Sequence, residues 1–300
     1  MSIIVQNISK SFKNTPALKN ISFDVEEGEL FGLIGPDGAG KTTLFRILTT
    51  LLFADEGVAK VAGFDLVNDF KSIRKNVGYM PGKFSLYQDL TVEENLDFYA
   101  TIFGTTIEEN YELIKDIYIQ IEPFKKRRAG KLSGGMKQKL ALSCALIHKP
   151  KVLFLDEPTT GVDPVSRKEF WEMLKRLQKK GITILVSTPY MDEAALCDRI
   201  ALIQHGEILK IDTPKAIENN YAKTIYSITA TNKYQLIQLL KKYEHTYSAF
   251  PFGENVHYTD ARMHFNSTDL KNYLEINGLN DVEIAKTNVT IEDVFMDLTK

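Results

Sequence analysis

Hydrophobic positions along the chain follow two alternating patterns. Short apolar runs, typical of buried β-strands, are separated by stretches in which apolar residues recur every three or four positions, as in amphipathic helices. The runs at 152–155 and 182–186 are almost entirely apolar. Strands of this kind are buried on both faces, so they predict a parallel sheet covered by helices.

Through residue 213 the alternation predicts an α/β domain. Strands are expected near 2–8, 20–25, 29–34, 58–62, 77–80, 151–156, 182–187, 199–203 and 207–211. Helices are expected near 41–52, 91–103, 108–120, 135–147, 165–179 and 190–196. Residues 82–130 show helical patterns without a clear strand, and we interpret them as a helical insertion.

Beyond Thr213-Pro214 the pattern of apolar and polar positions changes, which predicts a second domain over 214–300. Its expected elements are a strand at 224–230, a helix at 232–243, strands at 246–250 and 261–266, a helix at 267–276, a strand at 281–286 and a short helix at 291–298. The order βαββαβ predicts a small ferredoxin-like α+β domain. Its histidines, His245, His257 and His264, lack a ligand spacing and are interpreted as surface or strand residues.

Composition narrows the classes of function. Lysine and arginine number 37 against 39 acidic residues, which argues against a nucleic-acid coat or a polybasic membrane binder. No apolar run has the length of a membrane span, and the first residues lack the pattern of a signal peptide, so a cytosolic chain is expected. Cys144 and Cys197 lie in apolar helical contexts and are interpreted as core residues.

Residues 35–42 carry the first chemical motif, G-x-x-x-x-G-K-[ST], between an expected strand and an expected helix. Such a loop wraps backbone N–H groups around phosphates at a helix N-terminus, where the dipole favours anions. Lys41 would reach the outer phosphates, and the Thr42 hydroxyl would ligate Mg²⁺. The predicted ATP-binding residues of the loop are Gly35, Pro36, Asp37, Gly38, Ala39, Gly40, Lys41, Thr42 and Thr43.

Two carboxylates follow the apolar run at 152–155. A strand there would deliver Asp156 to the sheet edge beside the phosphate loop, where it can hold Mg²⁺ directly or through water. Glu157 is the candidate catalytic residue, because a carboxylate at this place can polarise an attacking water. An ordinary acidic strand end is the alternative for Glu157 alone.

A serine-glycine turn precedes the helix expected at 135–147. It consists of Ser133, Gly134, Gly135 and Met136. Ser133 can cap the helix, and the glycines allow close backbone approach, which suits a phosphate. The chain already has one phosphate loop, so this turn makes sense if it serves a nucleotide held by another subunit. A plain helix cap is the alternative for the motif in isolation.

Together these motifs resemble an ABC transporter ATP-binding subunit over about residues 2–213. The resemblance implies a head-to-tail dimer that holds two ATP with Mg²⁺, each between one chain's phosphate loop and the other's signature turn at 133–136. Asp163 matches the family's D-loop, and Phe12 matches an aromatic that stacks on adenine, although a strand-core role is the alternative. Residues 290–295 resemble a segment near the end of export-type subunits.

Two positions depart from the family's pattern. Gly82 stands where the family places a glutamine that contacts Mg²⁺ and the water, and Pro189 stands where it places a histidine that hydrogen-bonds the γ-phosphate. Gln88 is too far along the chain to substitute. Proline suits a first helical turn after a Thr188 cap, so the fold is expected to survive. The resemblance then predicts a site that binds ATP and turns over slowly.

The expected function is the ATP-binding subunit of a membrane exporter on the cytoplasmic face of the membrane. Its expected partners are a permease and a second ATP-binding subunit, in a heterodimer or a homodimer, with no nucleic acid. Two roles are open for Phe84, Leu86 and Tyr87. They would form the apolar floor of a groove for a permease helix, or they would simply pack within the helical insertion. A non-catalytic regulatory partner and a soluble, non-transport ABC ATPase are the alternative functions.

Overall fold

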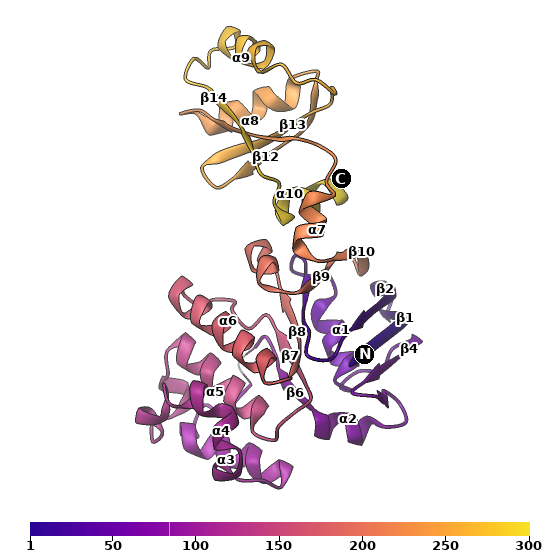
Figure 1. Cartoon of the computed structure of the whole chain (residues 1–300), viewed down its shortest axis with the longest axis vertical. Helices are drawn as coiled ribbons and strands as arrows, with labels where there is room; N and C mark the ends of the chain where they lie inside the picture. The colour runs from indigo at the N-terminus through magenta and orange to yellow at the C-terminus, as the bar shows by residue number, and fades with distance from the viewer. Residues whose placement is uncertain (84) are drawn as a thin grey trace. The chain divides into compact units, whose positions relative to one another are not determined.

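The computed structural model describes residues 1–83 and 85–300. The chain divides into two compact units, Met1–Pro214 and Lys215–Lys300 (Figure 1). Within the described residues, no helix combines the length and the apolarity needed to cross a membrane.

A six-stranded sheet forms the centre of the first unit, in the order β10-β9-β3-β8-β7-β6. Its strands are β3 (Leu30–Ile34), β6 (Val77–Met80), β7 (Val152–Asp156), β8 (Thr183–Thr188), β9 (Arg199–Gln204) and β10 (Glu207–Asp212). Only the pairing of β10 with β9 is antiparallel. Every residue of β3, β7 and β8 is buried, which confirms the parallel, helix-covered sheet.

The helices of the first unit pack on this sheet and on one another (Figure 1). They are α1 (Lys41–Leu48), α2 (Phe70–Asn76), α3 (Val92–Phe103), α4 (Ile107–Tyr118), α5 (Gly134–Leu146) and α6 (Pro164–Lys179), with the 3₁₀ turns η1 (Glu122–Phe124), η2 (Ala129–Lys131) and η3 (Met191–Leu196). Phe45 of α1 meets Phe154 of β7 edge to face at 5.8 Å between ring centroids. Helices α3 and α4 form the insertion and pack against α5. Thr91 with Glu94 makes the capping box that starts α3.

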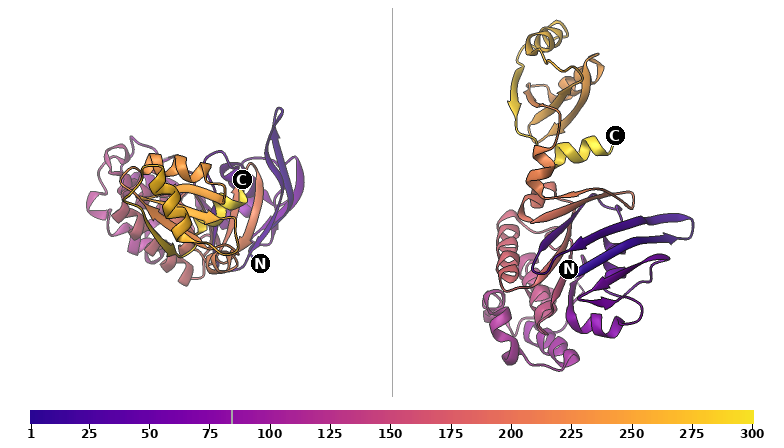
Figure 2. Two further views of the ribbon diagram at one scale, coloured as in Figure 1. Left: turned by 90° about the horizontal axis from the view of Figure 1, so that it is seen from above. Right: turned by 45° about the vertical axis from the view of Figure 1, so that its right-hand side comes forward.

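A second, antiparallel sheet lies beside the first, in the order β2-β1-β4-β5 (Figure 2, right). Its strands are β1 (Ile3–Phe12), β2 (Thr15–Val25), β4 (Glu56–Val61) and β5 (Phe64–Asp65). The apolar side chains that these strands turn inward pack with α1 and the larger sheet in one core, which includes Ile3, Val5, Leu44 and Phe45. Both Cys144 and Cys197 are buried, as expected for core residues.

The structure corrects three expectations in this unit. Helix α1 ends at Leu48 rather than near 52, because Thr49 turns its hydroxyl back to the Phe45 carbonyl and Thr50 takes a positive φ of 61°. Helix α2 was not expected. The segment at 190–196 is the 3₁₀ helix η3, which begins only at Met191.

The second unit has the element order α7 (Pro214–Asn219), β11 (Ile225–Thr229), α8 (Lys233–Lys242), β12 (Thr246–Phe252), β13 (Asn255–Asp260), α9 (Ser267–Ile276), β14 (Glu283–Thr287) and α10 (Ile291–Leu298). The sheet order is β12-β13-β11-β14, antiparallel throughout. With α8 and α9 as its two crossovers, this is the ferredoxin-like arrangement that the element order predicts.

The strand expected at 261–266 was wrong, because β13 ends at Asp260. A two-residue loop at 253–254 joins β12 to β13, with Phe252 opposite Asn255. Strand β13 therefore begins at Asn255, before the expected range of 261–266. The Asp260 carboxylate then accepts hydrogen bonds from the Arg262 backbone and guanidinium, which turns the chain out of the sheet. Helix α7, before β11, was also not expected.

Candidate nucleotide site

The phosphate loop joins β3 to α1 and is fixed against its neighbours. At Gly40, φ is 106°, and a Cβ there would lie 2.6 Å from the Ala17 carbonyl oxygen. At Gly35 a Cβ would lie 2.1 Å from the Ile203 carbonyl oxygen. The Gly35 N–H donates to the Thr188 carbonyl at 3.2 Å. Only glycine fits at these two positions, because neighbouring backbone comes too close for a side chain. This close packing explains why the motif has glycine at 35 and at 40.

Lys41 brings a cation to the centre of the site. Its side chain is 3% exposed, and Nζ donates to the carbonyl oxygens of Gly35 at 2.7 Å and Pro36 at 2.9 Å. The same Nζ lies 3.0 Å from Oε1 of Glu157. The candidate phosphate-binding cation and the candidate catalytic carboxylate, more than a hundred residues apart in sequence, are therefore in contact.

The two carboxylates at the end of β7 have different surroundings. Asp156 is buried and accepts a hydrogen bond from the Ser187 hydroxyl at 2.7 Å. Glu157 lies just beyond the strand with φ 50°, and its N–H donates to the Ser187 hydroxyl at 3.0 Å. Burial, followed by the nearby Asp156 charge, raises the pKa of Tyr79 to about 12. The buried Asp156 and the exposed Thr42 beside the loop supply hard oxygen ligands that fit Mg²⁺.

Gly82 lies directly beside these carboxylates. A Cβ at this position would be 3.0 Å from the Asp156 carbonyl oxygen and 3.8 Å from the Cβ of Glu157. A side chain at residue 82 would therefore project into the candidate site, and glycine leaves that position empty. Gln88 packs instead against Gly130, whose N–H donates to the Gln88 carbonyl at 2.9 Å.

Pro189 follows β8 beside the phosphate loop, because the Thr188 carbonyl accepts the Gly35 N–H. The expectation that Pro189 lies in a first helical turn capped by Thr188 was wrong. Helix η3 begins two residues later, and its N-cap, Tyr190, makes no side-chain cap. The Thr188 hydroxyl accepts the Tyr190 N–H at 3.0 Å in a local turn that leaves Pro189 outside the helix.

The signature turn and the D-loop form a second group. Ser133 caps α5 by accepting the Met136 N–H at 3.4 Å, as expected. A Cβ on Gly135 would lie 2.9 Å from the hydroxyl of Ser166 in α6. Asp163 caps α6 through the Ser166 N–H at 3.0 Å, and hydrogen bonds lower the pKa of the Asp163 carboxyl. Ser133 and Gly134 are exposed at this helix N-terminus.

Phe12 ends β1 and is 48% exposed, with the Lys10 ammonium 5.9 Å from its ring centroid. The alternative of a strand-core residue was therefore wrong. A large aromatic ring at this exposure is free to stack on a flat ligand.

Sequence reasoning missed two residues next to the carboxylates of the site, Ser187 and Tyr79, and a buried carboxylate outside it, Glu193. Glu193 is 2% exposed and accepts hydrogen bonds from Thr159 and Thr188. The apolar strand containing Ser187 and the polar segment Met191-Asp192-Glu193 carried no motif of their own. Only the pairing of β7 with β8 brings Ser187 beside Asp156.

Comparison with known proteins places these motifs in a family. Residues 18–160 match the family described as ABC transporter. The chain is 39% identical over 302 residues to YbhF, a probable multidrug ABC transporter ATP-binding protein of Escherichia coli (strain K12), which covers 99% of this chain and 52% of that protein. This chain thus spans about half the length of that relative.

Other relatives match along most of their length. Nod factor export ATP-binding protein I of Rhizobium sp. (strain N33) is 33% identical over 304 residues, covering 100% of this chain and 97% of that protein. The solved structure of an ATP-binding subunit of an ABC transporter superposes with a TM-score of 0.67 at 27% identity, over 74% of this chain and 93% of that chain.

A dimeric ATP-binding cassette in a post-hydrolysis state, bound to ADP and Pi, superposes with a TM-score of 0.64 at 26% identity, over 70% of this chain and 98% of that chain. The phosphate loop, the carboxylates that follow β7 and the capped signature turn occur here on the same fold. The chain belongs to the family of ABC transporter ATP-binding proteins.

Proposed function

We propose that this chain binds Mg-ATP and hydrolyses it as the ATP-binding subunit of a membrane exporter. The contact between Lys41 Nζ and Glu157 Oε1, at 3.0 Å, is the observation that carries the proposal. It sets the cation that would hold the outer phosphates against the carboxylate that would activate water. The names of the relatives, which include multidrug and Nod factor export proteins, support an export role.

The residues have separate roles in this reaction. Backbone N–H groups of the loop from Gly35 to Thr42 hold the phosphates, and Lys41 neutralises their charge. Thr42 and Asp156 hold Mg²⁺, which supplies Lewis-acid stabilisation when bound. Glu157 orients and polarises the attacking water, and Phe12 stacks on the adenine. A γ-phosphate held by Lys41 would compete with the Glu157 carboxylate for the same ammonium group.

The signature turn serves a second cassette. Ser133, Gly134 and Gly135 present a helix N-terminus at an exposed position, which suits an anion brought by another subunit. The head-to-tail arrangement pairs each chain's loop with the other's turn. Asp163, in the adjoining D-loop, then lies at the dimer interface.

We infer that the working dimer is asymmetric. The signature turn is complete, whereas Gly82 and Pro189 remove two groups that would contact the water and the γ-phosphate. Loss of one preorganised donor typically costs about 10²–10³ in rate. This chain's own loop would then hold ATP with slow turnover, while its signature turn completes a faster site on a different subunit. A homodimer that relies on Glu157 alone is the competing arrangement.

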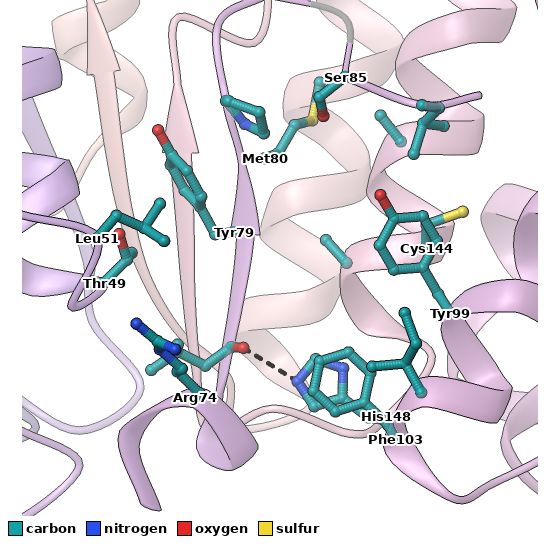
Figure 3. Close-up of a pocket in the computed structure, with 16 residues that line it drawn as sticks. Thr49, Leu51, Arg74, Tyr79, Met80, Ser85, Tyr99, Phe103, Cys144 and His148 are labelled. Atoms are coloured by element: carbon teal, nitrogen blue, oxygen red, sulfur yellow. Dashed lines mark hydrogen bonds between the residues drawn. The ribbon is translucent and has the colours of Figure 1, made fainter. Parts of the chain in front are cut away.

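A groove between the insertion, β6 and α5 is proposed to receive the permease at the cytoplasmic face of the membrane. Its volume is about 370 Å³. Figure 3 shows Tyr79, Met80, Tyr99 and Phe103 around it. Leu86 lines the groove, as expected, whereas Tyr87 lies outside the lining and packs on Phe98 at 4.8 Å. Phe84, the third expected floor residue, lies outside the described residues. The apolar lining suits a short amphipathic helix.

The test of this function separates binding from hydrolysis. Lys41→Met is expected to abolish binding of a fluorescent ATP analogue, whereas Glu157→Gln is expected to keep the affinity and lower turnover about 10²–10⁴-fold. Lys139→Met is the matched control, since Lys139 pairs with Glu169 at 2.9 Å instead. Unchanged turnover in both Lys41→Met and Glu157→Gln would show that ATP is not hydrolysed at the proposed site.

The export role needs a separate measurement. The full chain is purified from detergent-solubilised membranes of its own host, and its associated subunits are identified by mass spectrometry. A polytopic membrane protein and a second ATP-binding subunit are expected at stoichiometric amounts. A chain that binds and hydrolyses ATP but recovers neither would instead favour a soluble ATPase.

A further inference from the structure

A buried carboxylate outside the phosphate site joins three segments of the first unit. Glu193, in η3, is 2% exposed. Its Oε2 accepts the Thr159 hydroxyl at 3.1 Å and the Thr188 hydroxyl at 2.5 Å. Two hydroxyl groups, one from the loop after β7 and one from the end of β8, thus converge on a single oxygen atom.

The other oxygen of Glu193 is held by α6. Oε1 accepts the Nε–H of Arg167 at 3.1 Å, and Nη2 of Arg167 lies 3.0 Å away. Arg167 also contacts Asp192 at 3.2 Å and lies 4.3 Å from the ring centroid of Tyr190. Both oxygens of the carboxylate therefore have partners, as a buried charge requires.

Each joined segment leads to a part of the proposed reaction. Thr159 comes two residues after Glu157. Thr188 precedes Pro189 and holds the Gly35 N–H through its carbonyl oxygen. Arg167 lies one helical turn beyond Asp163, the N-cap of α6. None of these three residues lies in the phosphate loop itself. The network therefore acts on the position of their segments relative to the phosphate loop.

We propose that Glu193 is a positioning residue that holds the Glu157–Asp163 loop against the turn containing Pro189. The inference rests on the proposed role of Glu157 in hydrolysis. Well-packed apolar side chains generally stabilise a core as well as a buried ion pair does, so stability alone does not call for this network. Pro189 offers no side-chain donor, and the Thr188 hydroxyl holds this turn through its bonds to the Glu193 carboxylate and the Tyr190 N–H.

The test substitutes Glu193→Gln in the full chain. The amide removes the negative charge opposite Arg167, and it has one oxygen where the carboxylate has two. If that oxygen stays on Arg167, the NH2 group replaces the atom that accepts the two threonine hydroxyls, and those bonds are lost or reversed in direction. Single-turnover hydrolysis of radiolabelled ATP, followed for hours, is expected to slow by up to about 10²-fold per ATP-competent chain, with the ATP affinity retained. Hydrogen exchange is expected to rise only in peptides that cover 157–167 and 187–196.

Two further variants make the test specific. Thr159→Val is expected to slow turnover by itself and to add little to Glu193→Gln, because both break the same bond. Glu193→Asp keeps the charge and is expected to restore part of the rate. Glu169→Gln, which breaks the ion pair of α6 with Lys139, is the control and is expected to leave turnover unchanged.

Three results would overturn the inference. They are a parallel loss of affinity and turnover in Glu193→Gln, exchange that rises throughout the unit including β3 and α1, and unchanged turnover with unchanged exchange. An unsubstituted chain that binds ATP and hydrolyses none contradicts the proposed hydrolysis instead. In that case the exchange pattern of Glu193→Gln still decides whether this residue holds the loop.

Discussion

At the scale of single residues, the candidate site has the groups proposed to bind ATP but lacks two side chains proposed to act in its turnover. The loop that would hold the phosphates is complete, and its lysine is buried with its ammonium beside Glu157. Gly82 lies beside Glu157, and Pro189 follows Thr188, whose carbonyl accepts the Gly35 N–H, but neither residue has a side-chain donor. Both departures leave the backbone intact, so each can be reversed by one substitution, which makes the inferred slow turnover testable.

Gly82→Gln is expected to raise turnover. The new amide would project beside Asp156 and Glu157, where it can contact water and Mg²⁺, and a restored donor of this kind is worth up to about 10²–10³-fold. Its Cβ lies 3.0 Å from the Asp156 carbonyl oxygen, so a small backbone shift is needed. Gly82→Ala supplies the same Cβ without the amide, and steady-state ATP hydrolysis by the two variants measures the difference.

Pro189→His is expected to act in the same direction, because imidazole can donate to the γ-phosphate. Pro189→Ala is the matched control, since it removes the ring without adding a donor. Turnover is measured in each single variant and in combination with Gly82→Gln. If the unsubstituted chain already hydrolyses ATP rapidly, and neither substitution raises the rate, the asymmetric dimer is wrong and the homodimer is favoured.

The sequence could predict these residues because their spacing is set by local geometry. The phosphate loop and the carboxylates at the end of β7 each lie at one strand-to-helix connection, and the capped turn lies at the start of α5. Ser187 and Glu193 could not be predicted, because their partners come from strand pairing and from a 3₁₀ turn far along the chain. Phe12 is a third case. Its sequence context fits either a buried or an exposed ring, and the hairpin between β1 and β2 decides that the ring is exposed.

At the scale of elements, the insertion borders an apolar groove, and the second unit has a core of its own. Helices α3 and α5 meet β6 around an apolar groove. His148 lines it, stacked on Phe103 at 3.7 Å between ring centroids. Burial lowers the pKa of His148, so the ring adds no cation to the groove at neutral pH.

Ile102→Glu is expected to weaken membrane association without changing ATP affinity. Ile102 lines the groove and is 58% exposed, so a carboxylate there costs little folding energy but opposes an apolar partner. Ile119→Glu, at a similarly exposed position of 53% outside the groove, is the control. Co-sedimentation with host membranes measures both. Equal loss in the two variants would point to a general charge effect instead of docking.

His257→Leu is expected to destabilise the second unit selectively. His257 Nδ1 lies 2.7 Å from Oδ1 of the buried Asp293 in α10, and Phe252 stacks on its ring at 3.9 Å. Removing the imidazole leaves a buried carboxylate oxygen without this partner, which costs about 1–3 kcal/mol or more. His264→Leu, at an exposed position of the same unit, is the control. Thermal unfolding followed by circular dichroism measures the difference.

Element existence was easier to predict than element boundaries. Long apolar runs and clear helical periods gave β3, β7, β8, α3 and α6 near their observed ranges. Helix α2 was missed because it is short and its buried side chains are few, Ile73 alone among its residues. The strand placed at 261–266 was wrong because the hairpin loop at 253–254, rather than the apolar residues, sets where β13 begins and ends.

At the scale of the whole molecule, each unit has a hydrophobic core of its own among the residues that the structure describes. One is built on the two sheets and α1, and the other on β11, β13, α8 and α9. All residues proposed to bind ATP and Mg²⁺ or to form the signature turn lie in Met1–Pro214. A unit with its own core is expected to fold without its neighbour.

A chain that ends at residue 214 is therefore expected to fold and to bind ATP with the affinity of the full chain. The full chain is expected to unfold in two transitions, of which only one moves to higher temperature when Mg-ATP is added, because a ligand stabilises only the unit that binds it. Calorimetry with and without Mg-ATP measures both. A single transition in the full chain, or loss of ATP binding on truncation, would show that the second unit is needed for the nucleotide site. Folding of one unit would then depend on the other, although each unit packs around its own core.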